Sequence, residues 1–93
     1  MLPRNTELNY KIKFTDDGWR RFEKLDKRIK EKVLSKLGML SNYSQLNNVK
    51  KMVGKDDNYY RLRVGDIRVL FWVEEDLKVI WITDVGFRGA IYK

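Results

Sequence analysis

Alternation of apolar and polar positions in the second half of the chain predicts a β-hairpin. The runs Tyr60–Val64 and Ile67–Val73 both place large apolar side chains at every second position, as a strand with one buried face does. Gly65 and Asp66 lie between the runs and form a two-residue turn of the hairpin kind. The two runs are therefore expected to pair as neighbouring antiparallel strands.

This hairpin brings three arginines together. Arg61 and Arg63 alternate with the apolar residues of the first run, and Arg68 lies among the alternate positions of the second. Pairing of the strands therefore places all three guanidinium groups on one face of a small sheet.

The first half of the chain predicts a strand followed by two helices. Leu8–Phe14 alternates like a half-buried strand, and Thr15 with the acids after it is typical of a helix start. Asp26 is a second N-cap candidate, and it precedes a stripe of apolar residues at helical spacing, namely Ile29, Val33, Leu37 and Leu40. The lysines and arginines between these positions are interpreted as a solvated basic face.

The remaining segments complete the expected fold. Ser41–Asp57 has little periodicity and is interpreted as a loop, whereas Leu77–Val85 is apolar on both faces and predicts a third antiparallel strand. The expected fold class is α+β: an N-terminal strand, a helical hairpin and then an antiparallel β-meander, with the helices packed on one face of the sheet. Residues 1–93 are expected to form a single domain.

Composition limits the chemistry that the chain can perform. The 93 residues include no cysteine and no histidine, which excludes disulfides, thiolate metal sites and catalysis by Ser-His-Asp, Cys-His or histidine ribonuclease chemistry. No signal peptide or transmembrane run is found, so a cytoplasmic protein is expected. The net charge of +7 favours a polyanionic partner such as nucleic acid.

The arginines are the candidate functional residues. Arg88 follows the last expected strand, so it can join Arg61, Arg63 and Arg68 in a cluster that binds phosphate oxygens. Tyr92, together with Tyr59, could stack on an unpaired base. The alternative is that each arginine pairs with a neighbouring carboxylate, with Asp66, Glu74 and Asp84 as the candidates.

Two motifs carry a resemblance to a known family. The hairpin motif YRLRVGDIRVLF and the terminal VGFRGAIY resemble the RelE/ParE superfamily of toxin–antitoxin toxins, and the likeness covers nearly the whole chain. In the RelE branch the resemblance implies a metal-independent endoribonuclease that cuts messenger RNA, typically on the ribosome, and so inhibits translation. The reaction that the resemblance implies is attack of the ribose 2′-hydroxyl on its adjacent phosphate, which leaves a cyclic phosphate. No small-molecule cofactor and no membrane partner are expected.

The family's functional positions map onto five residues of this chain, which the resemblance makes candidate catalytic residues: Arg61, Arg63, Arg68, Arg88 and Tyr92. The first two correspond to lysines in well-known RelE members. Because arginine keeps its proton to about pH 12, these two positions are assigned to phosphate binding and charge stabilisation. The resemblance places the strand arginine on the scissile phosphate and the tyrosine beside the base at the cut. Phe87 stands where relatives often have histidine.

Alternative functions remain open from the sequence. A ParE-like toxin would inhibit DNA gyrase without cutting RNA, and a non-catalytic domain would only bind its antitoxin. The resemblance also implies a cognate antitoxin, expected to be small, acidic and amphipathic, besides messenger RNA and the ribosome as partners. Leu70 and Trp72 are expected on the sheet face away from the helices, where an antitoxin could cover them. The competing interpretation is that these residues are core beneath the C-terminal tail.

Overall fold

A computed structural model of the protein describes residues 10–52 and 58–87. Two helices pack on a five-stranded mixed sheet, and the fold is α+β as the sequence predicts. The elements follow the order β1 (Lys11–Phe14), α2 (Asp16–Glu23), α3 (Lys27–Leu37), the 3-10 helix η1 (Leu40–Gln45), β2 (Val49–Lys51), β3 (Tyr59–Val64), β4 (Ile67–Glu74) and β5 (Val79–Phe87). None of the described helices has the length and apolar character needed to cross a membrane.

Both helices begin where the capping residues predict. The Thr15 hydroxyl accepts a hydrogen bond of 3.0 Å from the Gly18 amide at the start of α2. The Asp26 carboxylate accepts one of 3.0 Å from the Ile29 amide at the start of α3. Each cap satisfies an amide that lacks a partner within its helix, so these side chains determine where the helices start.

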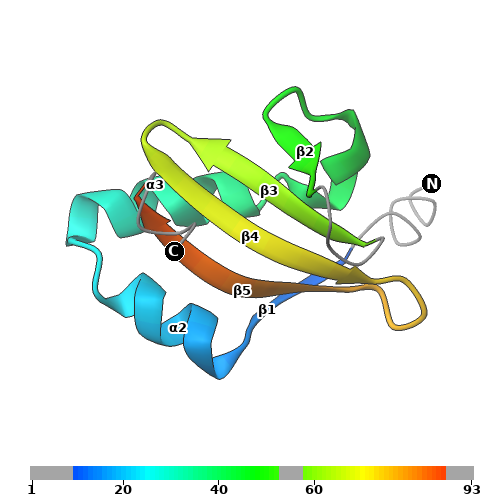
Figure 1. Ribbon diagram of the computed structural model, residues 1–93, viewed down its shortest axis with the longest axis horizontal. Helices are drawn as coiled ribbons and strands as arrows, with labels where there is room; N and C mark the ends of the chain where they lie inside the picture. The colour runs from blue at the N-terminus through cyan, green and yellow to red at the C-terminus, as the bar shows by residue number, and fades with distance from the viewer. Residues whose placement is uncertain (1–9, 53–57, 88–93) are drawn as a thin grey trace, which may run out of the picture.

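The sheet has the strand order β1-β5-β4-β3-β2. The expected meander β3-β4-β5 forms its centre, and β1 pairs in parallel with β5 at one edge. Gly65 adopts a φ of 59° in the β3–β4 turn, a conformation that glycine reaches without steric cost. In Figure 1, the two long strands of this hairpin lie side by side with β5, and α3 passes behind them.

Three segment boundaries of the prediction were wrong. The expected loop Ser41–Asp57 contains strand β2, antiparallel to β3, and part of η1. The last strand was expected at Leu77–Val85 but spans Val79–Phe87, because Lys78, with a φ of 56°, still belongs to the turn. The first strand was expected at Leu8–Phe14 but begins at Lys11, because Tyr10 is not in the strand; Leu8 and Asn9 lie outside the described residues.

The hydrophobic core lies between the helices and one face of the sheet. On the sheet side, β4 supplies Val69, Phe71 and Val73, and none of the three is accessible to solvent. The helical layer supplies Phe22, Val33, Leu37 and Leu40. The alternate side chains of β3, β4 and β5 therefore project from the opposite side of the sheet, which is called the open face below.

Candidate functional site

The open face carries the arginines of the hairpin. Arg63 of β3 lies directly opposite Arg68 of β4, and Arg61 lies opposite Leu70 one row further along the same face. Their strand neighbours Leu62 and Val64 are buried in the core on the other side. The three arginines therefore share one face, in the arrangement that the alternation predicts.

Arg68 is held against the hairpin turn. Its side chain is only 8% exposed, and its Nη1 donates hydrogen bonds to the carbonyl oxygens of Gly65 (3.2 Å) and Ile67 (3.4 Å). Arg63, by contrast, is exposed. Two guanidinium groups thus lie in adjacent positions, one fixed by backbone carbonyls and the other accessible to a ligand.

Within the described ranges, no carboxylate pairs with Arg63 or Arg68. Two of the three expected partners have other contacts. Asp84 lies 3.5 Å from Nε of Arg21 on α2, and Glu74 accepts a hydrogen bond of 3.0 Å from the Trp81 indole. The positive charge of Arg63 and Arg68 is therefore not neutralised by the acids of the described sheet and helices.

Two expected site residues, Arg88 and Tyr92, lie outside the described residues. Phe87, immediately before Arg88, is the last residue of β5 and is 48% exposed. Gly86 pairs with Arg68 across β4 and β5. The described part of β5 therefore ends beside the arginines of the hairpin.

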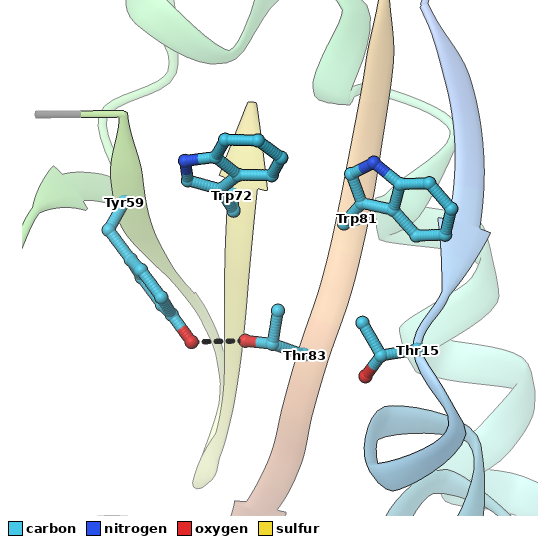
Figure 2. Close-up of a pocket in the computed structure, with 5 residues that line it drawn as sticks. All are labelled: Thr15, Tyr59, Trp72, Trp81 and Thr83. Atoms are coloured by element: carbon cyan, nitrogen blue, oxygen red, sulfur yellow. Dashed lines mark hydrogen bonds between the residues drawn. The ribbon is translucent and has the colours of Figure 1, made fainter. Parts of the chain in front are cut away.

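An aromatic pocket on the open face was not singled out from the sequence. Its volume is about 450 Å³, and its described lining residues are Thr15, Tyr59, Trp72, Trp81 and Thr83 (Figure 2). Trp72 and Trp81 are direct partners across β4 and β5, and Tyr59 is the partner of Trp72 on the other side. The expected placement of Trp72 on this face is correct, but only the strand register reveals that three aromatic residues form one row.

Hydrogen bonds hold the walls of the aromatic pocket in place. The Thr83 hydroxyl lies 3.3 Å from the Leu70 carbonyl oxygen, to which it donates, so its bond with Tyr59 uses the phenolic hydrogen. The irregular pairing of β4 with β5 between Leu70 and Phe71 brings Thr83 to this position. Beside the pocket, Lys13 places its Nζ 5.8 Å from the centre of the Trp81 ring.

The resolved pKa shifts lie at the other end of β4 from Arg68. Tyr10 and Tyr43 each donate a hydrogen bond of 2.9 Å to the Glu75 carboxylate, and these three residues are called the tyrosine–glutamate clasp. Burial and the bond to Glu75 raise the pKa of both tyrosines. Burial alone would raise the pKa of Glu75, but the two tyrosine hydroxyls and Lys78 outweigh it and lower that pKa. The clasp ties the β4–β5 turn to the residue before β1 and to η1.

Known proteins resemble this chain over most of its length. Residues 12–92 match the family described as ParE toxin of type II toxin–antitoxin system, parDE. The chain belongs to this toxin family. The sequence-based recognition of the RelE/ParE superfamily is thereby confirmed, and the protein is a toxin of a toxin–antitoxin system.

Individual relatives carry RelE names. A curated Escherichia coli protein named as RelE-like toxin is 27% identical over 81 residues, which are 87% of this chain and 85% of that protein. The toxin–antitoxin complex RelBE2 of Mycobacterium tuberculosis contains a chain with a TM-score of 0.74 and 26% identity, covering 86% of this toxin and 99% of that chain. For the RelE–RelB complex of Pyrococcus horikoshii the TM-score is 0.72 and the identity 28%, with coverages of 87% and 97%.

Proposed function

We propose that this toxin is an endoribonuclease that cuts messenger RNA, on the ribosome and without a metal ion, and thereby inhibits translation. The observation that carries the proposal is the placement of Arg61, Arg63 and Arg68 on the open face. The last two are not neutralised by a described carboxylate. A guanidinium group presents several donors in a plane, which suits the oxygens of a phosphodiester.

In the proposed reaction, the ribose 2′-oxygen bonds to phosphorus and the bond from phosphorus to the 5′-oxygen breaks. The 2′-hydroxyl loses a proton, the departing 5′-oxygen gains one, and a 2′,3′-cyclic phosphate remains. Arg61, Arg63, Arg68 and Arg88 are assigned to binding the phosphate and stabilising the negative charge that grows on its oxygens. Tyr92 is assigned to orienting the base beside the cut.

The proposal further includes a cognate antitoxin that is small, acidic and amphipathic. The two solved relatives described above are both complexes of a toxin with its antitoxin. An acidic chain would neutralise the arginines, and an apolar segment would cover the open face beside Leu70. Co-expression of the toxin with the product of the adjacent reading frame, followed by co-purification, tests this partner.

Primer extension on translated message tests the nuclease. The Arg63→Ala variant should lower the cleavage rate about 100-fold or more, because it removes a proposed phosphate ligand. The Arg63 side chain is exposed and makes no hydrogen bond or ion pair among the described residues, so its removal should leave the fold intact. Arg28→Ala is the matched control, since Arg28 is exposed on α3 and should leave cleavage unchanged. Equal rates for wild type and Arg63→Ala would contradict the assignment.

A ParE-like function is the second candidate, because the matching family is that of ParE toxins. Such a toxin would block supercoiling by DNA gyrase and leave messenger RNA intact. A supercoiling assay run beside primer extension separates the two candidates. Activity in neither assay, together with tight antitoxin binding, would identify a non-catalytic binding domain.

A further inference from the structure

The aromatic pocket offers flat walls. Tyr59, Trp72 and Trp81 come from three adjacent strands and occupy one row across the open face. Lys13 of β1 continues this row, because it pairs with Trp81 and holds its Nζ 5.8 Å from the indole centre. Aromatic rings flanked by a cation are the recurring surface on which unpaired nucleobases stack. The volume of about 450 Å³ also lies in the range of small-ligand pockets, roughly 300–1,000 Å³.

Hydroxyl groups lie on one side of these rings. The hydroxyl groups of Thr15, Tyr59 and Thr83 lie on the side of the pocket away from the two indoles in Figure 2. The hydrogens of these hydroxyls are used within the protein, because Tyr59 donates to Thr83, Thr83 to the Leu70 carbonyl and Thr15 to the Ile82 carbonyl. Each hydroxyl oxygen has two lone pairs, so this side can still accept a hydrogen bond from an N–H group on the edge of a base.

A positive charge lies at one end of the pocket. Arg61 is two residues from Tyr59 on the same strand face, a separation of about 7 Å. On the α2 side, the aromatic pocket shares Thr83 with a polar pocket of about 310 Å³ that contains Arg20 and Arg21, paired with Asp17 and Asp84.

Carboxylates lie at the opposite end. Glu74, Glu75 and Asp76 line a third pocket, of about 250 Å³, which also borders Trp72. A nucleotide with its base in the aromatic pocket is therefore favoured in one orientation, with its phosphate towards Arg61 and away from Glu74.

We infer that the aromatic pocket is a binding subsite for one unpaired nucleobase of an RNA strand whose adjoining phosphate lies on the hairpin arginines. The inference rests on the proposed function, because it places one base of that function's substrate. It adds Trp72 and Trp81 as residues that hold the substrate strand beside the arginines. The register supports this, since the row of Arg63 and Arg68 lies two rows from that of Trp72 on the same face.

The experiment uses a single-stranded decamer of 2′-O-methyluridine, which cannot be cut by attack of its 2′-oxygen. Its counterpart is a decamer with the same phosphates and abasic sugars. Affinity of the full-length toxin for each is measured by anisotropy of a terminal label. Trp72→Ala should weaken binding of the base-bearing decamer by about 5- to 150-fold, the range for losing one stacked base, and should leave the weaker binding of the abasic decamer unchanged.

Two further variants protect the interpretation. Trp72→Phe keeps an aromatic ring and should retain most of the affinity, which separates stacking from a general loss of structure. Trp19→Phe is the matched control, because Trp19 is 45% exposed on α2 and does not line the pocket. This control should leave the affinity unchanged. It should also increase the fraction of tryptophan emission that the decamer quenches, since the two remaining indoles lie in the pocket.

Either of two results would overturn the inference. One is equal affinity of wild type and Trp72→Ala for the base-bearing decamer, including the case in which Trp72→Ala weakens only antitoxin binding. The other is equally tight binding of the two decamers by wild type. Because the assay needs neither cleavage nor the ribosome, failure of the nuclease proposal is seen separately. If the toxin binds the base through Trp72 but cuts no message, the inference about the aromatic pocket stands and the nuclease proposal is wrong.

Discussion

Arg63 and Arg68 are partners across β3 and β4, yet their environments differ. Arg68 is buried and bound to two carbonyl oxygens of the hairpin turn, whereas Arg63 is exposed. Removal of Arg68 would leave these carbonyls without their partner and would disturb the turn as well as the site. Arg63 is therefore the better probe of phosphate binding, although the two residues look equivalent in the sequence.

The tyrosine–glutamate clasp predicts an acid-sensitive contribution to stability. The folded protein lowers the pKa of Glu75 below its ordinary value of 4.5. The clasp therefore stabilises the fold above that pH, and this contribution is lost as the pH falls through the folded-state pKa. Glu75→Gln should lower the free energy of unfolding by about 1 kcal/mol at pH 7, a modest value because the carboxylate is partly exposed. The difference in free energy of unfolding between Glu75→Gln and wild type should become smaller as the pH is lowered.

Urea unfolding at a series of pH values between 7 and 3 measures this difference. Asp76→Asn is the matched control, because Asp76 is exposed in the same turn and has no hydrogen bond among those described. It should follow the wild-type profile. A Glu75→Gln deficit that stays constant down to pH 3 would contradict the assigned role of the carboxylate.

At the scale of elements, α2 lies directly on the backbone of β5. The Ile82 carbonyl oxygen accepts hydrogen bonds from the Thr15 amide (3.0 Å) and hydroxyl (3.3 Å), and Gly18 sits against the same carbonyl. A Cβ at Gly18 would lie 2.1 Å from that oxygen. The close approach of the helix to the strand therefore requires a residue without a side chain at this position.

Gly18→Ala should consequently destabilise the toxin by about 2–3 kcal/mol or more, because either α2 or β5 has to move. Thermal unfolding followed by circular dichroism measures the loss. Gly38→Ala is the matched control, since a Cβ there would meet its nearest atom, the Ser35 carbonyl oxygen, at 3.6 Å. Gly38 already has helical φ and ψ, so this control should be neutral or slightly stabilising. Similar melting temperatures for the two variants would refute the close packing.

The elements also differ in how well local pattern predicts them. Long alternating runs predicted β3 and β4 almost to the residue, because each buries one complete face. The three residues Val49–Lys51 contain a single apolar side chain, and β2 forms because the backbone of β3 is available to pair with it. Strand β5 was placed two residues too early, because Leu77 extends its apolar pattern into the turn and is itself exposed.

At the scale of the molecule, the net charge of +7 would attract any polyanion, so total charge alone does not locate a binding site. The salt dependence of binding, compared between variants, does locate the site, because each phosphate contact releases condensed counterions and so steepens the decrease of affinity with salt. Four contacts, from the proposed phosphate ligands Arg61, Arg63, Arg68 and Arg88, predict that the logarithm of the affinity for the single-stranded decamer falls with a slope of about −3 against the logarithm of the salt concentration.

Arg63→Ala should make this slope shallower by about 0.7, the value for one contact to a single strand. Arg28→Ala removes the same charge from the exposed surface of α3 and should leave the slope unchanged. Titrations at several salt concentrations measure both slopes. Equal changes for the two variants would mean that the basic helices, not the hairpin, contact the phosphates.

The sequence by itself determined the fold class, the helix starts and the face on which the hairpin arginines lie. These features depend on side-chain alternation and on caps such as Thr15 and Asp26, which act over a few residues. The motifs also determined the family. The likeness did not decide between the two proposed activities, because one fold can carry different functions.

Only the tertiary structure decided which distant residues meet. The parallel pairing of β1 with β5 brings Lys13 to Trp81, and the irregular register of β4 with β5 brings Thr83 to Tyr59. Arg68 is buried whereas Arg63 is exposed, and the packing of α2 on β5 leaves no room for a Cβ at Gly18. Each of these contacts joins segments far apart along the chain or depends on the packing around a side chain. Local periodicity does not predict these contacts. It indicates which side of its own helix or strand a residue faces, but not which other segment packs against that side.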